Sequence, residues 1–183
     1  MANALRETER LNSLIDNLLM ANRLNSGEYI FKFEKQDLSE LIRSIAGQYY
    51  ASLLNSGELT LSTQPGTISH IDVTAFPSVI MNLIDNAVKY SFDHKKIAVS
   101  CYRKSNTIHI LVSDEGVGIP DSEKHKVFNQ FYRSGNEETR STKGTGLGLY
   151  IVKYIVTKHS GEIMINNNQP KGTTFEIQLH GVQ

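Results

Sequence analysis

A glycine-rich run near the C-terminal end of the chain has the composition of a loop that holds a phosphate. The run leads directly into an apolar segment that we expect to be helical. Glycine lacks a Cβ, so its backbone can approach an anion closely, and the free N–H groups at a helix N-terminus attract phosphate. Glycine-rich turns before helices are also common as structural features, so the run alone leaves both interpretations open. Its residues are Gly144, Thr145, Gly146, Leu147, Gly148 and Leu149.

A second polar group lies on a predicted helix earlier in the chain. Apolar residues recur at helical spacing through residues 75–91, and Asn82, Asn86 and Lys89 form a stripe opposite them. Asparagine is a poor helix former, and its carbonyl oxygen is a hard ligand that suits Mg²⁺. Lysine can meet a phosphate as a point charge. The stripe fits a solvated helix face on the plainer interpretation, and a site for phosphate and Mg²⁺ on the other.

Two further segments combine residue types that suit a nucleotide. Residues 114–119 begin with Asp114 directly after a predicted strand and continue through a Gly-x-Gly sequence. A carboxylate at a strand end can accept a hydrogen bond from an exocyclic amine such as adenine N6, although an ordinary Asp/Gly turn has the same composition. Residues 128–133 carry two phenylalanines and end in Arg133. They predict either a short amphipathic helix over a pocket, with the arginine donating to a terminal phosphate, or a core-packing patch.

The composition limits the classes of protein to which the chain can belong. Of its 183 residues, 39% are hydrophobic, and 19 lysines and arginines balance 19 aspartates and glutamates, which argues against broad electrostatic binding of nucleic acid. The single cysteine, Cys101, excludes an internal disulfide and a cysteine-based zinc site, and its alternating apolar surroundings predict burial. No apolar run approaches the roughly 20 residues of a membrane span, and no signal peptide is visible. We therefore expect a soluble chain from a reducing compartment, or a soluble piece of something larger.

The elements that must position these residues follow from hydrophobic periodicity. Residues 4–25 predict a helix with a narrow apolar stripe that needs a partner helix, so we treat residues 1–27 as a separate unit and 28–183 as the main domain. Strands paired mostly as hairpins, with helices on one face, predict an α+β sandwich. The expected helices run from Asp37 or Ser39 to about Leu54, over 75–91 and over 146–159; the expected strands lie at 59–62, 71–73, 97–101, 108–112, 163–165 and 175–179.

The four polar segments, in this order, resemble the N, G1, F and G2 boxes of the ATP-binding catalytic domain of sensor histidine kinases. The boxes correspond to residues 82–90, 114–119, 128–133 and 144–149, and the resemblance covers about residues 5–180. It implies the Bergerat fold that gyrase-like ATPases share. This fold is a two-layer α/β sandwich with a mixed, mostly antiparallel sheet and helices on one face, here preceded by an N-terminal helix.

The resemblance also implies roles for individual residues. Asn86 is the expected Mg²⁺ ligand, Asp114 is expected to hold adenine N6, and Arg133 is expected to reach the γ-phosphate from a lid formed by residues 120–143. Asn82, Asn86 and Arg133 are the expected catalytic residues. The expected ATP-binding residues are Asn82, Asn86, Lys89, Tyr90, Asp114, Gly116, Gly118, Ile119, Tyr132, Arg133, Lys143, Gly144, Thr145, Gly146, Leu147, Gly148, Leu149 and Thr173.

Position 82 separates the members of this superfamily. Gyrase-like ATPases carry a glutamate there that activates water, whereas Asn82 cannot act as a general base. The resemblance therefore predicts that the domain holds Mg-ATP without rapid hydrolysis and transfers the γ-phosphoryl group to a histidine. None of the six histidines has the sequence context of that phosphoacceptor. Residues 1–27 resemble the C-terminal part of the second helix of the dimerisation domain, so we expect a fragment whose acceptor histidine lies outside the chain.

The expected partners follow from the same resemblance. They are ATP, the dimerisation and phosphoacceptor domain, and a response regulator, with a homodimer through residues 1–27 as a further option. We expect no nucleic acid and no membrane contact for this fragment, which we place in the cytoplasm, with a membrane anchor in the parent protein left open. Two alternatives remain: a gyrase-like ATPase or anti-sigma-type serine kinase, and a degenerate nucleotide-binding interaction module. The polar segment 134–142 is expected to be disordered without nucleotide.

Overall fold

A computed structural model of the chain describes residues 15–91, 95–134 and 144–182. Its centre is a five-stranded sheet with the strand order β2-β4-β5-β7-β6. β2 and β4 are parallel, and the other neighbouring pairs are antiparallel, so the sheet is mixed and mostly antiparallel as predicted. The strands are β2 (Leu59–Thr63), β4 (Ile97–Lys104), β5 (Thr107–Asp114), β6 (Glu162–Asn167) and β7 (Thr173–His180).

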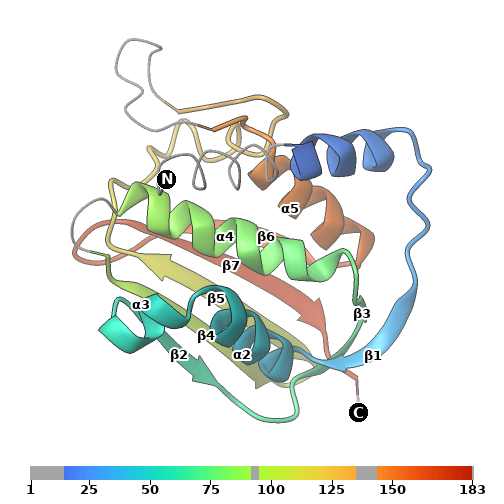
Figure 1. Cartoon of the computed structure of the whole chain (residues 1–183), viewed down its shortest axis with the longest axis horizontal. Helices are drawn as coiled ribbons and strands as arrows, with labels where there is room; N and C mark the ends of the chain where they lie inside the picture. Colours follow the sequence, from blue (N-terminus) through green and yellow to red (C-terminus); the bar gives the residue numbers. More distant parts are fainter. Residues whose placement is uncertain (1–14, 92–94, 135–143, 183) are drawn as a thin grey trace, which may run out of the picture.

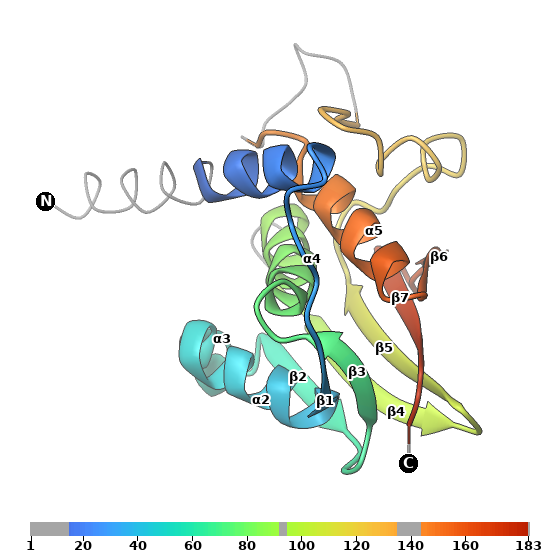
Figure 2. The same ribbon diagram turned by 90° about the vertical axis from the view of Figure 1, so that its right-hand side faces the viewer.

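The helices cover one face of this sheet, as Figures 1 and 2 show. Alternate residues of the central strands point toward the helices and are buried, among them Val99, Ile110 and Ile177. The opposite face of the sheet is polar, with His109 Nδ1 lying 2.9 Å from Glu176 Oε1. The predicted α+β sandwich is confirmed. The helices are α2 (Leu38–Tyr49), α3 (Ala51–Ser56), α4 (Phe76–Tyr90) and α5 (Gly148–Lys158).

The sequence explains the position of α4. Pro77 stands in its first turn, where a missing N–H costs no hydrogen bond. Val79, Ile80, Leu83 and Ile84 share one side of the helix and are fully buried. That side packs toward the sheet, so the stripe that contains Asn82, Asn86 and Lys89 is turned away from the core.

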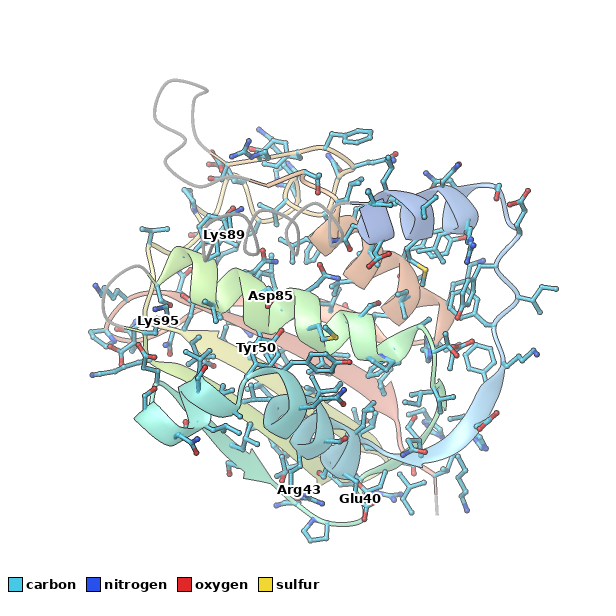
Figure 3. The ribbon with its side chains drawn as sticks, in the orientation of Figure 1. Glu40, Arg43, Tyr50, Asp85, Lys89 and Lys95 are labelled. Atoms are coloured by element: carbon cyan, nitrogen blue, oxygen red, sulfur yellow. The ribbon has the colours of Figure 1, made fainter. Side chains whose placement is uncertain are left out.

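Three local features differ from the sequence-based expectation. The predicted helix to about Leu54 is interrupted at Tyr50, where α2 ends and α3 begins. The Tyr50 hydroxyl donates a hydrogen bond of 2.7 Å to the carboxylate of Asp85 on α4, and the two side chains face each other in Figure 3. Residues 128–133 form turns, so the short helix, one of the two predictions for this segment, is wrong, whereas Phe128 packs against the core as the other prediction had it. A two-stranded ribbon of β1 (Phe33–Asp37) and β3 (Ile68–Asp72), which the sequence did not predict as a pair, lies outside the main sheet.

The described part of the N-terminal helix, residues 15–25, packs against α5. Ala21 and Leu24 are both only 1% exposed. The Tyr154 hydroxyl donates a hydrogen bond of 2.8 Å to the carbonyl of Leu24, and the Tyr150 hydroxyl donates to the side chain of Asn25. Backbone carbonyls in the last turn of a helix lack partners within the helix, and Tyr154 satisfies one of them.

Asp72 connects four parts of the fold. Its carboxylate accepts hydrogen bonds from the Lys32 backbone N–H at 2.7 Å, from the Tyr29 hydroxyl at 3.0 Å and from the Ala75 N–H, directly before α4, at 2.8 Å. Its own backbone N–H donates to Nε2 of His159, which follows α5, at 2.9 Å. Burial opposes ionisation of Asp72, but the hydrogen bonds from Lys32 and Ala75 outweigh burial and lower its pKa.

Replacement of Asp72 by asparagine is expected to lower the free energy of unfolding by about 2 kcal/mol at neutral pH, because an amide cannot accept all of these hydrogen bonds. The gap between wild type and Asp72→Asn should shrink as the pH falls, because the stabilisation from a carboxylate with a lowered pKa is lost on protonation in the folded state. Urea unfolding across the acid range measures this. Glu34→Gln, at an exposed position of β1, is the control and should change stability by less than about 0.5 kcal/mol. A gap independent of pH would contradict the assignment.

Candidate functional site

The glycine-rich run lies along the polar stripe of α4. Gly148 is the first residue of α5, and a Cβ placed on it would lie 2.5 Å from Oδ1 of Asn82. A Cβ on Gly144 would lie 2.6 Å from Nζ of Lys89. Real Cβ atoms do not approach other heavy atoms this closely, so a larger residue at either position would have to displace the end of the Asn82 or Lys89 side chain. The start of α5, whose N–H groups lack partners within the helix, therefore borders the side chains of α4.

The polar stripe of α4 carries a cation and amide groups that are open to a ligand. Nζ of Lys89 lies 3.2 Å from the hydroxyl of Tyr90 and 4.7 Å from the centre of its ring, and no carboxylate of the described residues pairs with it. Figure 3 shows Lys89 near the C-terminal end of α4. The Asn82 amide donates 2.8 Å to the carbonyl of Ser78. Asn86 is half-buried, and within the described parts of the chain its amide has no hydrogen-bond partner.

Asp114 ends β5 and is only 5% exposed. Its Oδ1 accepts hydrogen bonds from the backbone N–H groups of Gly116 at 2.8 Å and Thr173 at 3.3 Å. Among the described residues no donor reaches Oδ2. Burial raises the pKa of Asp114 above its ordinary value, although the two backbone hydrogen bonds act in the opposite direction. The carboxyl group therefore keeps one acceptor oxygen for a ligand.

The backbone around Asp114 is tightly packed. A Cβ on Gly172, which has a φ of 104°, would lie 2.7 Å from the carbonyl carbon of Asp114. A Cβ on Gly116 would overlap the carbonyl of Tyr90, at the end of α4. Gly118 has a φ of 74°, and a Cβ on it would lie 3.5 Å from the carbonyl oxygen of Gly172. The end of α4, the end of β5 and the β6–β7 turn thus meet at one place.

The segment before the glycine-rich run contacts the run itself. The N–H of Phe131 donates 3.0 Å to the carbonyl of Gly146, and a Cβ on Gly146 would lie 2.8 Å from the carbonyl oxygen of Tyr132. Phe131 has a φ of 63°, a left-handed conformation that is incompatible with the short helix that was one of the two predictions. Arg133 follows and is half-buried. Lys143 and the remainder of the predicted lid, residues 135–143, lie outside the described residues.

The remaining predicted site residues line the same region. The side-chain oxygen of Thr145 accepts from the N–H of Leu147 at 3.4 Å, and Leu147 is buried. Ile119 and Leu149 pack against the core, and Thr173 is buried beside Asp114. The described residues contain no cluster of three or more His, Cys, Asp or Glu side chains that could hold a metal ion. A cation here would need oxygen ligands from a bound phosphate group in addition to the protein, as is usual for Mg²⁺.

Comparison with known proteins decides the family. Residues 71–183 match the family described as "Histidine kinase-, DNA gyrase B-, and HSP90-like ATPase", which is more than half of the chain. The chain belongs to this family. Within it, the chain is the catalytic, ATP-binding domain of a two-component sensor histidine kinase, as the four boxes predicted.

Individual proteins that resemble the chain are also sensor kinases. The sensor protein SrrB of Staphylococcus aureus is 32% identical over 98% of this chain, which spans 31% of the length of SrrB. The structure of the mycobacterial sensor histidine kinase MprB has a TM-score of 0.67 and 29% identity, and the match covers 82% of this chain and 98% of that one. The histidine kinase ThkA, in complex with its response regulator protein TrrA, shares the fold, with a TM-score of 0.76, 21% identity and coverage of 97% and 49%.

Sequence reasoning did not identify Asn168, Gly172 or Asp85 in the kinase domain. Asn168 donates 2.8 Å to the carbonyl of Asp114, and Asp85 binds Tyr50. Gly172 directly precedes the predicted site residue Thr173, and this position in the sequence is the one signal that could have identified Gly172. Among the described residues, no helix of the kinase domain is long and apolar enough to cross a bilayer.

Gly172→Ala is expected to lower the free energy of unfolding by at least about 2 kcal/mol, because its Cβ would overlap the Asp114 backbone and its φ is unfavourable for alanine. Gly47→Ala is the matched control, since open space surrounds Gly47 in α2. That change should raise stability by about 0.5–1 kcal/mol, because alanine favours the helix. Thermal and urea unfolding of the two variants would measure the difference. Equal effects would show that the packing at Gly172 is not restrictive.

Proposed function

We propose that this domain binds Mg-ATP between α4, α5 and the end of β5, and transfers the γ-phosphoryl group to a histidine outside the chain. The observation that carries the proposal is the pairing of two features at one site. Asp114 is a buried carboxylate with one oxygen unused by the described protein groups, and the glycine-rich run borders the cation of Lys89. One feature suits an exocyclic amine and the other suits a polyphosphate.

The base would bind at the end of β5. In the proposal, Oδ2 of Asp114 accepts a hydrogen bond from adenine N6, while Gly116, Gly118 and Ile119 let the ring lie close to the backbone. Thr173, whose N–H already contacts Asp114, lies beside the carboxyl group and can contribute its hydroxyl. The burial of Asp114 supports this role, because a hydrogen bond in a water-poor site discriminates more strongly between bases.

The triphosphate would lie between α4 and the start of α5. Lys89 and the N–H groups of Gly146 and Gly148 suit its negative charge, and Asn86 supplies an amide oxygen for Mg²⁺. Bound Mg²⁺ neutralises charge on the phosphates during transfer. Asn82, Tyr90 and Thr145, with Gly144, Leu147 and Leu149, complete the walls. Tyr132 and Arg133 approach from the segment that contacts Gly146, and Lys143 is included on the sequence alone.

The reaction that fits these groups is phosphoryl transfer rather than hydrolysis. The bond between the γ-phosphorus and its bridging oxygen breaks, a bond to an imidazole nitrogen forms, and ADP leaves. Asn82 stands where a general base would be needed to activate water, and an amide cannot take that proton. The chain's own residues thus bind, orient and neutralise charge. The buried His159, caged by aromatic rings, is unsuited as the acceptor.

The proposed partners are a dimerisation domain that carries the acceptor histidine and a response regulator. Residues 1–27 would belong to that dimerisation domain. Ile15, Leu18 and Leu19 are each about half exposed on the described part of the helix, which supports a partner helix and a homodimer. Because ATP is the proposed substrate, we place the domain in the cytoplasm.

Calorimetry with ATP and Mg²⁺ is the direct test of binding. Wild type should bind saturably, and Asp114→Asn should weaken ATP binding about tenfold or more, because the amide presents a poorer acceptor to adenine N6. Glu115→Gln, the neighbouring carboxylate, is the control and should bind like wild type. Absence of saturable binding, or equal affinity in Asp114→Asn, would refute the proposed site.

Phosphotransfer to a separately supplied dimerisation domain, with ATP labelled at the γ-phosphate, tests the reaction. Asn86→Ala should lower the transfer rate by about a hundredfold, because Mg²⁺ would lose its protein ligand and the phosphates their orientation. Without an acceptor, wild type should release phosphate only slowly. Fast steady-state phosphate release would favour the ATPase alternative, and failure to label the acceptor histidine would favour the degenerate module.

A further inference from the structure

The strand pairing stops next to Asp114. β5 and β7 pair as far as Ser113 and Thr174, and the register would bring Asp114 opposite Thr173 next. At that position, hydrogen bonds that involve side chains take the place of the backbone hydrogen bonds between β5 and β7. The Thr173 N–H donates to Oδ1 of Asp114 at 3.3 Å, and the side-chain amide of Asn168 donates to the Asp114 carbonyl at 2.8 Å. Both donors come from the β6–β7 turn and its edge, which Figure 1 shows beside the end of β5.

The Asn168 side chain is not needed to close its own turn. The backbone N–H of Asn168 donates to the carbonyl of Gly172 at 3.1 Å, and this bond joins the two ends of the turn without any side chain. The side-chain amide instead crosses to a different element. Asn168 is half-buried, so its hydrogen bond to Asp114 is partly shielded from water.

These contacts restrict both the side chain and the backbone of Asp114. On the side-chain end, Oδ1 is held by the N–H groups of Gly116 and Thr173. On the backbone end, the peptide group is held by Asn168 and lies against Gly172. The Asn168 hydrogen bond restrains the orientation of the peptide that follows Asp114. The two N–H groups on Oδ1 restrain the χ1 and χ2 angles, and together these contacts limit where Oδ2 lies.

We propose that Asn168 is a positioning residue for base recognition: through the Asp114 carbonyl it fixes the carboxylate oxygen that reads the 6-amino group of adenine. This inference rests on the proposed function, because it assigns that role to Asp114. Without the Asn168 hydrogen bond, the peptide after Asp114 gains freedom, and the geometry of the carboxylate toward N6 becomes less favourable. Precise placement of a hydrogen-bonding group is what separates substrates that differ by one such group.

The test compares ATP with the triphosphate of purine riboside, which lacks the 6-amino group. A residue that only stabilises the fold would weaken both ligands by the same factor. A residue that positions Asp114 would weaken ATP more, because only ATP has the amine that Asp114 binds. The measured quantity is the preference, the ratio of the two dissociation constants obtained by calorimetry with Mg²⁺ on the whole chain.

Wild type should prefer ATP about tenfold or more. Asn168→Ala should lower that preference about threefold to tenfold, mainly through weaker ATP binding. Asn168→Asp, which keeps the size but cannot donate to a carbonyl, should lower it as well and provides a second variant. Gln169→Ala changes an exposed residue of the same turn and should leave the preference unchanged. In an Asp114→Asn background, Asn168→Ala should produce no further change in preference.

The possible outcomes distinguish the role of Asn168 from the proposed role of Asp114. A wild-type preference that Asn168→Ala and Asn168→Asp leave intact would overturn the role of Asn168 while Asp114 keeps its own. A wild type that binds both triphosphates equally would overturn the proposed function of Asp114, and this inference with it. An additional loss of preference in the Asp114→Asn background would show that Asn168 acts by another route.

Discussion

The structure depends on backbone approaching side chains and backbone at distances that leave no room for a Cβ. Gly148 and Gly144 meet the polar stripe of α4, and Gly172 meets the end of β5. The backbone contact of Gly172 with Asp114 fixes the β6–β7 turn against the end of β5, whereas Gly148 and Gly144 let the start of α5 and the run before it lie close to the Asn82 and Lys89 side chains. The hydrophobic core determines which sides of the helices face the sheet, and the glycine contacts then determine how closely their polar ends can converge on a ligand.

α4 is held by contacts at its start and in its middle, which explains how a helix with two asparagines keeps a defined orientation. At its start, Asp72 accepts from the N–H of Ala75 and joins the helix to the segment before β1. In its middle, the hydroxyl of the buried Tyr50 binds Asp85, the neighbour of Asn86. Burial and the nearby carboxylate raise the pKa of Tyr50, so the hydroxyl remains a donor.

The fold was predictable where the sequence pattern is strong. The 3.6-residue period in residues 75–91 left one polar side of the helix, and the structure brings that side to the glycine-rich run. Features that rest on contacts between distant residues were not predictable. The β1 sequence lacks an alternating pattern, so its pairing with β3 left no local signal, and Asn168 is one of three consecutive asparagines whose environments differ only in three dimensions. The left-handed Phe131 overrode the helical spacing of its neighbours.

The hydrogen bond from the Tyr154 hydroxyl to the Leu24 carbonyl couples the movement of α5 to that of the N-terminal helix. An α-helix is stiff over the roughly 16 Å that its 11 residues span, so a displacement at Tyr154 moves or tilts the helix as a whole and is not absorbed by bending. Any rotation of the N-terminal helix that carries Leu24 along must therefore tilt α5 or break this hydrogen bond. Gly148 lies in the first turn of α5, against Asn82. A tilt of α5 would therefore change the distance between α4 and α5 at this point.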